Sequence, residues 1–360
     1  MRLIPFGGFL GAGKTTTMLA AARWLESAGE RVAVITNDQG TDLVDTQLAR
    51  LAGPGAVAEV TGGCFCCRFD DLAATIKLLR EQVDPTVILA EAVGSCTDLQ
   101  STVVRPLRHF YGAEIAVAPL TVVLDPLVYR ETSARWLPLA DEPDIAYLYR
   151  HQLDEANIIA VNKSDLVDDA EPLCTQLRAQ FPAATVLPIS AKTGAGIAEL
   201  LELWTGSAED RHAFDVNYDR YGAAEAELAW TNQTFTVTAP AGATFAPAGW
   251  VDRLLAEFAR ASAESSAMIG HVKVFAETGA GITKASLTGG SAPPTFDRRV
   301  ERKADRAAVT VNARVRIDPA GLAALIDRAV AVADQDGPTL SGDRSGRVFR
   351  PGFPVPVHRM

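Results

Sequence analysis

The chain has 360 residues, of which 48% are hydrophobic and 22% are charged, and this composition excludes disorder throughout. The length predicts two domains rather than one. The net charge of −10, with no long run of lysine and arginine, argues against a nucleic-acid partner. Because no apolar stretch of about 18 residues and no secretory leader is visible, we expect a cytoplasmic protein without a membrane partner.

Short apolar runs alternate with helical patterns along the first half of the chain, which is typical of an α/β domain with a mostly parallel sheet flanked by helices. The predicted strands are 3–6, 31–36, 86–90, 120–124, 157–161 and 185–189. The predicted helices include 15–27, 70–82 and 196–203. We therefore expect one domain over residues 1–205.

A different pattern follows this domain. Residues 206–228 mix charge, glycine and aromatic residues without a period, which predicts a linker with some local order. Strands are predicted at 230–238, 271–277, 282–288 and 308–317, and helices at 250–262 and 319–333. This order predicts a smaller α+β domain over 229–334. Residues 335–360 are rich in glycine, proline, serine and arginine, and predict a flexible tail or an extended docked segment.

Residues 8–15 read Gly-Phe-Leu-Gly-Ala-Gly-Lys-Thr and fit the phosphate-binding pattern G-x-x-x-x-G-K-[ST], between a predicted strand and a predicted helix. Glycines let backbone N–H groups close around phosphate oxygens, and the helix N-terminus adds partial positive charge. Lys14 would reach the outer phosphates, and the Thr15 hydroxyl would ligate Mg²⁺. The alternative is a glycine-rich turn with a surface lysine. The predicted phosphate-binding residues are Gly8, Gly11, Ala12, Gly13, Lys14, Thr15 and Thr16.

Residues 162–165 read Asn-Lys-Ser-Asp at the end of a buried predicted strand and fit the pattern NKxD. A carboxylate at Asp165 can accept hydrogen bonds from N1–H and the 2-amino group of guanine, whereas adenine lacks both donors along that edge. Such a site rejects the analogue that leaves its acceptors unpaired. The pattern therefore favours GTP over ATP, with Asn162, Lys163 and Asp165 as base-reading residues, and an ordinary polar turn is the alternative.

Three of the five cysteines fall within four positions, at Cys64, Cys66 and Cys67, directly after two glycines. Thiolates select zinc and similar metals, and a loop could wrap all three around one ion. Three thiolates would leave a fourth position open for water, another side chain or an acceptor protein. The alternatives are reduced thiols packed as small apolar groups, or a redox pair. Cys96 and Cys174 look isolated, and we expect core or surface thiols there.

The phosphate loop, the NKxD pattern and the Gly-Gly-Cys-x-Cys-Cys stretch together resemble the CobW-like branch of P-loop GTPases, relatives of UreG and HypB. The resemblance covers about residues 1–205 and implies a P-loop NTPase fold. It implies that Glu91, at the end of a predicted strand, orients Mg²⁺ or the attacking water. It also implies that the backbone of Ala191, in the stretch Ser-Ala-Lys, meets the guanine oxygen.

One loop departs from the family pattern. Residues 37–40 read Asn-Asp-Gln-Gly, where CobW-like proteins usually carry Asn-Glu-Phe-Gly. Asp38 is the candidate for the catalytic switch carboxylate, Asp45 competes with it, and a solvated loop acid is the alternative for either.

The resemblance implies an Mg²⁺-dependent GTPase that couples GTP hydrolysis to binding and transfer of a divalent metal, with Zn²⁺ favoured and Co²⁺ as the second option. The partner would be an unidentified client metalloprotein, and a nucleotide-dependent homodimer is a further implication. The five histidines are scattered, which argues against high-capacity metal delivery. The alternatives are a GTP-gated regulatory binding module and an accessory GTPase for a cobalamin-dependent enzyme.

Overall fold

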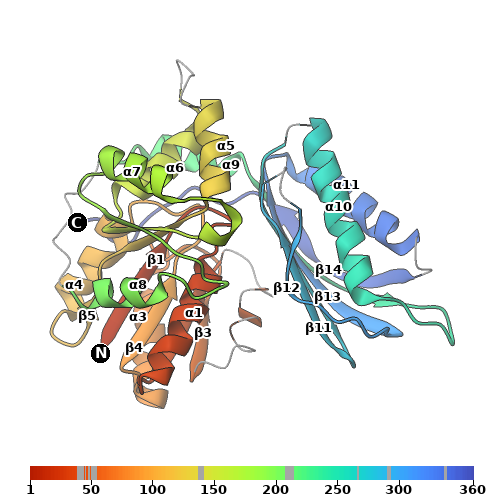
Figure 1. Ribbon diagram of the computed structural model, residues 1–360, viewed down its shortest axis with the longest axis horizontal. Helices are drawn as coiled ribbons and strands as arrows, with labels where there is room; N and C mark the ends of the chain where they lie inside the picture. Colours follow the sequence, from red (N-terminus) through yellow and green to blue (C-terminus); the bar gives the residue numbers. More distant parts are fainter. Residues whose placement is uncertain are drawn as a thin grey trace. The chain divides into compact units, whose positions relative to one another are not determined.

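A computed structural model describes residues 1–38, 44, 46–47, 49, 55–136, 142–206, 215–265, 267–289, 293–335 and 339–360. These residues form two compact units. The first takes the described residues within 1–39, 45–224 and 353–360, and the second takes those within 40–44 and 225–352. Figure 1 colours the chain from red at the N-terminus to blue at the C-terminus. The last eight residues of the chain thus belong to the first unit.

The first unit is built on an 8-stranded sheet in which every described pairing is parallel. Its order is β3-β2-β4-β1-β6-β7-β8, with β5 also paired to β1. The strands are β1 (Arg2–Gly7), β2 (Val32–Asn37), β3 (Ala56–Val60), β4 (Val87–Glu91), β5 (Ala116–Val117), β6 (Thr121–Leu124), β7 (Ile158–Val161) and β8 (Thr185–Pro188). Strands β1, β2, β4, β6 and β7 are almost wholly buried, as expected where helices cover both faces.

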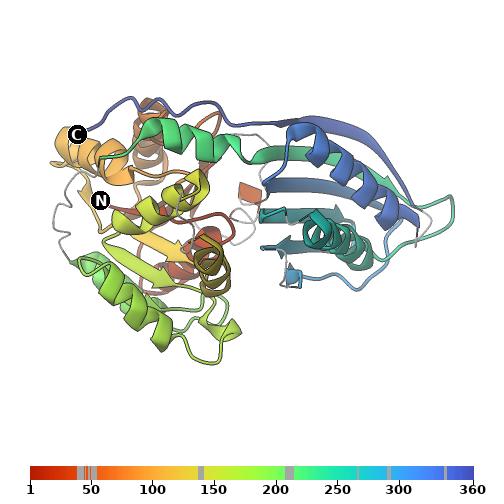
Figure 2. The same cartoon turned by 90° about the horizontal axis from the view of Figure 1, so that it is seen from above.

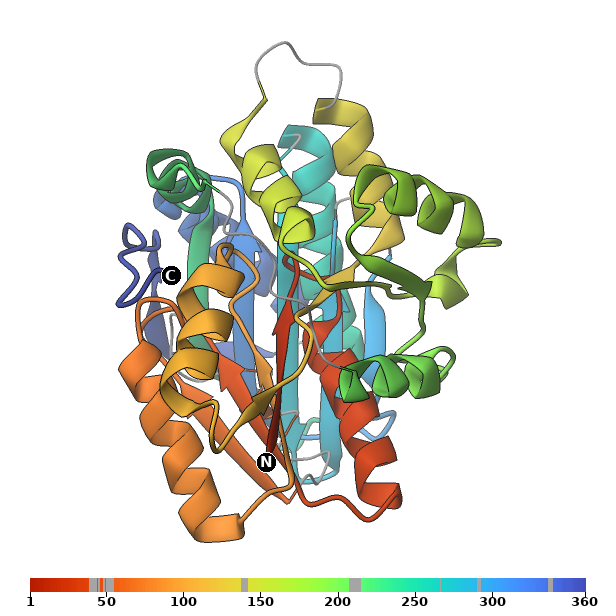
Figure 3. The same ribbon diagram turned by 90° about the vertical axis from the view of Figure 1, so that its left-hand side faces the viewer.

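Helices cover both faces of this sheet. In Figures 2 and 3, α3 and α4 (orange) lie on one side of the sheet, and α1 (red) and α8 (green) lie on the other. The α-helices of the first unit are α1 (Lys14–Ser27), α3 (Phe69–Val83), α4 (Arg105–Tyr111), α5 (Pro126–Trp136), α6 (Asp144–Asp154), α7 (Glu171–Gln180), α8 (Ile197–Thr205) and α9 (Tyr218–Ala226), the last two residues of α9 belonging to the second unit. A π-helix at Gln100–Val104 and a 3-10 turn at Ser164–Leu166 complete the unit.

The predicted fold class is confirmed, and the six predicted strands of the first half appear within one residue of their predicted ends. Short strands β3 and β5 were not predicted, because five and two residues carry too little periodicity to separate from a loop. Helix α9 supplies the local order expected in the linker region.

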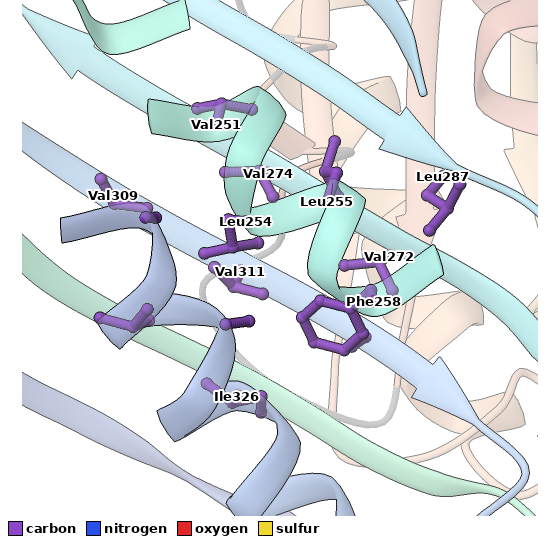
Figure 4. Packing of buried hydrophobic residues seen from close by; sticks show 14 of the residues in the cluster. Val251, Leu254, Leu255, Phe258, Val272, Val274, Leu287, Val309, Val311 and Ile326 are labelled. Atoms are coloured by element: carbon purple, nitrogen blue, oxygen red, sulfur yellow. The ribbon is translucent and has the colours of Figure 1, made fainter. Parts of the chain in front are cut away.

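The second unit is a 6-stranded antiparallel sheet covered by two helices. The sheet order is β12-β11-β10-β13-β9-β14. Its elements are β9 (Ala229–Thr238), α10 (Pro247–Ser265), β10 (Ile269–Thr278), β11 (Gly281–Leu287), β12 (Thr295–Arg298), β13 (Arg306–Val315), α11 (Pro319–Gln335) and β14 (Leu340–Phe349). Figure 4 shows apolar side chains of α10 and α11, among them Leu254, Phe258 and Ile326, meeting Val272, Val274 and Val311 of the sheet.

The C-terminal stretch corrects the expectation of a flexible tail from residue 335. Residues 340–349 form β14, which pairs along β9, and residues 353–360 hydrogen-bond to the first unit. Strand β14 is an edge strand whose side chains are mostly exposed, so backbone pairing stabilises it and no apolar period marks it in the sequence. No helix in the described ranges has the length and apolarity to cross a membrane.

Candidate nucleotide and metal sites

The phosphate loop joins the central strand β1 to α1. Positive φ angles of 123° at Gly8, 76° at Gly11 and 93° at Gly13 bend the backbone around the loop. A Cβ on Gly13 would lie 2.4 Å from the Asn162 Nδ2 atom, so only glycine fits at this close approach. The Lys14 ammonium donates to the carbonyls of Gly8, at 2.8 Å, and Phe9, at 3.3 Å. The lysine thus spans the loop in which a phosphate would sit.

Thr15 and Glu91 meet beside this loop. The Thr15 hydroxyl donates to the Glu91 carboxylate, at 2.8 Å to Oε2 and 3.0 Å to Oε1. Thr15 is the second residue of α1, and Glu91 ends β4, which lies next to β1 in the sheet. Both side chains are buried, and a hydroxyl with a carboxylate is the type of oxygen pair that Mg²⁺ accepts. The geometry fits the roles that the sequence predicts for both residues.

The base-reading loops after β7 and β8 are joined through Asn162. Its Nδ2 donates to the Ala12 carbonyl at 2.9 Å, and its Oδ1 accepts the Ala191 N–H at 3.0 Å. The Asp165 carboxylate accepts the Ser190 hydroxyl at 2.6 Å and is otherwise exposed. The predicted residues Ala12, Asn162, Asp165 and Ala191 therefore come together at the carboxyl ends of the strands, where ligands bind in parallel sheets.

Asp125 is a site residue that sequence reasoning missed. It follows β6, its Oδ2 pairs with the Lys163 ammonium at 2.6 Å, and its Oδ1 accepts the N–H of Leu127 at 2.9 Å. Lys163 has a left-handed φ of 57°. One carboxylate thus caps the start of α5 and also holds the lysine of the NKxD loop. The available signal was an acid placed directly after a buried strand and before a proline.

The three clustered cysteines converge in the turn between β3 and α3. The Cys64 sulfur lies 2.7 Å from that of Cys66 and 3.4 Å from that of Cys67, and the Cys66 and Cys67 sulfurs are 3.7 Å apart. All three are free thiols, and the N–H groups of Cys67 and Arg68 close the turn on the Cys64 carbonyl at 3.0 and 2.9 Å. Four sulfurs around zinc lie about 3.8 Å apart, because each Zn–S bond is about 2.3 Å. Two separations are near this value, and the donor set suits a thiolate-binding metal.

The thiols are not equivalent. Hydrogen bonding to Cys66 and Cys67 lowers the pKa of Cys64 well below its usual value, although Cys64 is buried. The contact with Cys64 raises the pKa of Cys66 well above its usual value and that of Cys67 to about 11. The pKa of Cys64 is therefore the lowest of the three.

Asn37 fastens the cysteine turn to the end of β2. Its Nδ2 donates to the carbonyls of Val60, at 2.9 Å, and Gly63, at 2.8 Å, while its Oδ1 accepts the Phe65 N–H at 3.0 Å. In the sequence Asn37 is notable only as the neighbour of Asp38, yet this buried amide contacts both sides of the turn. Its contacts link the loop after β2 with the cysteines.

Asp38, the predicted switch carboxylate, is half-buried directly after β2, and its N–H donates to the Val60 carbonyl at 3.2 Å. Its catalytic role stays a prediction. Asp45 lies outside the described residues. Thr16 is half-buried in the first turn of α1, and its nucleotide-binding role stays a prediction.

Cys96 is not as isolated as expected. It lies in the loop after β4 with 0% of its surface exposed, and its thiol is near enough to those of Cys64 and Cys66 to shift the pKa of both. Cys96 thus borders the cysteine cluster on its buried side. Cys174 is a core thiol of α7, as expected.

Comparison with known proteins adds family membership to this geometry. The family model described as CobW/HypB/UreG, nucleotide-binding domain, matches residues 3–188. A zinc chaperone CobW of Sinorhizobium sp is 30% identical over 188 residues, which cover 45% of this chain and 50% of that protein. The chain therefore spans about half the length of this curated relative.

Solved structures were also compared. HypB from Helicobacter pylori in complex with nickel is 18% identical, with a TM-score of 0.43 over 59% of this chain and 91% of that one. Zn(II)-bound YjiA GTPase from E. coli is 14% identical, with a TM-score of 0.38 over 92% of this chain and 97% of that one. The matched family region includes the phosphate loop, the cysteine turn, Glu91 and the NKxD loop, and the chain belongs to the CobW/HypB/UreG family.

Proposed function

We propose that this protein is a GTP-hydrolysing metal chaperone, which binds a divalent metal at Cys64, Cys66 and Cys67 and couples nucleotide state to its transfer. The single observation that carries the proposal is the convergence of three free thiols on one turn that Asn37 ties to the end of β2. In P-loop GTPases, loops beside the phosphate site reorder with the γ-phosphate.

The nucleotide half of the proposal assigns a role to each group of the phosphate and base-reading loops. Backbone N–H groups of the phosphate loop and the Lys14 ammonium would bind the phosphates. Thr15 would ligate Mg²⁺ and Glu91 would orient it or the attacking water, and the bound ion would supply charge neutralisation of the transferring phosphoryl group. Asp165 would accept two hydrogen bonds from guanine, and its exposure leaves its second oxygen accessible for them.

Zinc is the metal that we favour, with cobalt as the second option. Thiolates are soft ligands, and a site of three or four sulfurs in tetrahedral arrangement is typical of zinc. The Sinorhizobium relative is named as a zinc chaperone, which is consistent with this preference. Cys67 is the one thiol of the three that is not fully buried, so an acceptor would approach the cluster from its side.

Anaerobic titration of Co²⁺ into the reduced protein, with and without GTP and Mg²⁺, tests both halves. We expect one equivalent of Co²⁺, a thiolate-to-cobalt charge-transfer band, and an affinity that changes with nucleotide. The double variant Cys66→Ala, Cys67→Ala should lose the band, whereas Cys174→Ala, at a remote buried thiol, should retain it. A wild-type protein without the band, or with a band that nucleotide does not alter, would contradict the coupled chaperone.

The same band counts the sulfurs. Its intensity rises with each thiolate bound, so Cys96→Ser tests whether the neighbouring thiol joins the other three. We expect Cys96→Ser to leave the intensity and the one-to-one stoichiometry unchanged, because the three sulfurs that converge are those of Cys64, Cys66 and Cys67. A lower intensity would add Cys96 as a fourth ligand.

The protein that would receive the metal is a metalloprotein that needs a thiolate-binding divalent ion. A nucleotide-dependent homodimer is also part of the proposal. Two alternatives remain: a regulatory module whose cysteines only support structure, and an accessory GTPase of a cobalamin-dependent enzyme. Unchanged metal affinity in the double cysteine variant would favour the first, and co-purification of a corrinoid or its enzyme would favour the second.

A further inference from the structure

The last eight residues of the chain, Phe353 to Met360, lie against the first unit beside the cysteine turn. The Val355 N–H donates to the Cys67 sulfur at 3.2 Å, and the Val357 N–H donates to the Cys66 carbonyl at 2.9 Å. In Figures 1 and 2 the end of the chain, marked C, lies near the orange α4. One segment thus contacts two of the three clustered cysteines.

The far end of this segment is anchored by charge and hydrogen bonds. Arg359 pairs with the buried Asp98 carboxylate at 2.8 Å, and the Tyr218 hydroxyl donates to the same oxygen at 2.8 Å. The Met360 N–H donates to the Ser101 carbonyl at 2.9 Å, and Arg105 donates to the Met360 carbonyl at 2.8 Å. Because the Asp98 side chain is only 2% exposed, solvent and salt screen its attraction to Arg359 weakly.

Aromatic residues and a glycine of the first unit also contact this segment. The His358 ring lies 5.0 Å from the rings of Phe69 and Phe110, centroid to centroid. Phe353 lies on Gly222 of α9, where a Cβ would come within 2.5 Å of the Phe353 Cδ2 atom. Pro354 is buried and Pro356 is half-buried, whereas Val355 and Val357 are 67% and 44% exposed. The segment is therefore held by its backbone, its ends and His358.

The prolines fit the backbone pattern. Proline has no N–H, so Pro354 and Pro356 can be packed against the unit without a donor that needs a partner. The neighbouring residues, Val355 and Val357, supply the two donors that reach the cysteine turn. Because prolines alternate with valines, both N–H groups of residues 354–357 bind the cysteine turn.

We propose that residues 353–360 form a cover over the cysteine site, and that a metal bound there leaves at a rate set by the lifting of this cover. This inference rests on the proposed metal-binding function. A donor to a ligating sulfur stabilises the charged thiolate, and partners of metal ligands affect metal retention strongly. The cover also stands on Cys67, the one thiol of the cluster that is not fully buried.

The first test needs no metal. Hydrogen exchange of the full-length, metal-free protein should show protected amides at Val357 and Met360, because both donate to carbonyls of the first unit. Gly222→Val should speed exchange at these amides, since its side chain would displace Phe353. Gly279→Val, at a glycine of the second unit where a Cβ would meet no atom within 4 Å, is the matched control and should leave their exchange unchanged. Exchange of Val357 and Met360 at the rate of a free peptide in the wild type would overturn the cover.

The second test measures release of Co²⁺ or Zn²⁺ to an excess of chelator. Val355→Pro removes the N–H that contacts Cys67, together with the valine side chain, and fixes φ, whereas Val355→Ala removes the exposed side chain and keeps the N–H. We expect release from Val355→Pro to be about tenfold faster than from Val355→Ala, which should match the wild type. Gly222→Val should also release metal faster. Equal rates in all four proteins would overturn the proposed control of release.

The two tests separate this inference from the function on which it rests. A wild-type chain that protects Val357 and Met360 but shows no thiolate-bound cobalt would contradict metal binding and the release step, while the docked segment would stand. A chain that binds cobalt through thiolates but leaves both amides unprotected would retain the proposed function and contradict the cover.

Discussion

The Thr15 hydroxyl donates to the Glu91 carboxylate, with Oγ1 2.8 Å from Oε2, and joins the start of α1 to the end of β4. Thr15 is 6% exposed and Glu91 4% exposed, so the pair is shielded from solvent. The two oxygen donors proposed for Mg²⁺ therefore lie side by side in a buried position, held by α1 and β4 of the first unit.

Replacement of Glu91 by glutamine should stop catalysis more than binding. The amide keeps the size of the side chain and removes its charge, so GTP turnover should fall by about 100-fold while GTP affinity changes little. Phosphate release at saturating GTP measures the turnover. Fluorescence titration of a labelled GTP measures the affinity. Glu81→Gln, at a 63% exposed side chain of α3, is the control. Turnover within a few-fold of wild type would remove Glu91 from the site.

Asp165→Ala should abolish the preference for GTP over ATP. The variant loses the acceptor for the guanine donors, and its GTP affinity should fall toward its ATP affinity, because unpaired polar groups give discrimination of about 10,000-fold or more in sites of this type. Competition of both nucleotides against labelled GDP measures the ratio. Asp168→Ala, an exposed acid three residues on, should keep the wild-type ratio. A preference that survives in Asp165→Ala would show that another group reads the base.

Asn37→Ala should disconnect the cysteine turn from β2. The variant removes three hydrogen bonds, and each buried partner left unpaired costs about 1–3 kcal/mol. We expect weaker Co²⁺ binding and loss of the effect of GTP on it. Asn157→Ala removes an amide that bonds Gln100 and Leu120 in the same unit and serves as the stability control. Equal behaviour of the two variants would mean that Asn37 acts only on stability.

Glu155 predicts a pH dependence of stability. Burial raises the pKa of this carboxyl well above its ordinary value of 4.5, although the Gln100 N–H donates to it at 3.0 Å. Above pH 4.5 the folded state therefore binds more protons than the unfolded state, so stability falls as pH rises from this value through the folded-state pKa. Glu155→Gln lacks this dependence. The Tm of wild type minus that of Glu155→Gln should decrease from pH 4.5 upward. A constant difference would contradict a raised pKa.

The sequence predicts those parts of the molecule whose conformation depends on residues close together in the chain. The phosphate loop, the NKxD loop and six strands of the first unit depend on neighbouring residues, and the structure has them where they were expected. The hydrogen bond from Thr15 to Glu91 also follows from adjacent parallel strands, because their carboxyl ends share one edge of the sheet.

Other parts depend on partners that are distant in sequence. Asp125 pairs with Lys163, and Cys96 lies near Cys64. The Val355 N–H contacts Cys67, which is 288 residues earlier in the sequence. No spacing or period marks such a pair in a single sequence. Residues 340–349 gave no strand signal because edge pairing with β9, rather than burial of an apolar face, stabilises β14.

Asn162 binds the phosphate loop with one end of its amide and the Ala191 backbone with the other. The group that would sense the base and the group that would grip the phosphates therefore share a single rigid plane. Because one buried side chain holds both loops, its loss would loosen the phosphate loop and the base-reading loop together.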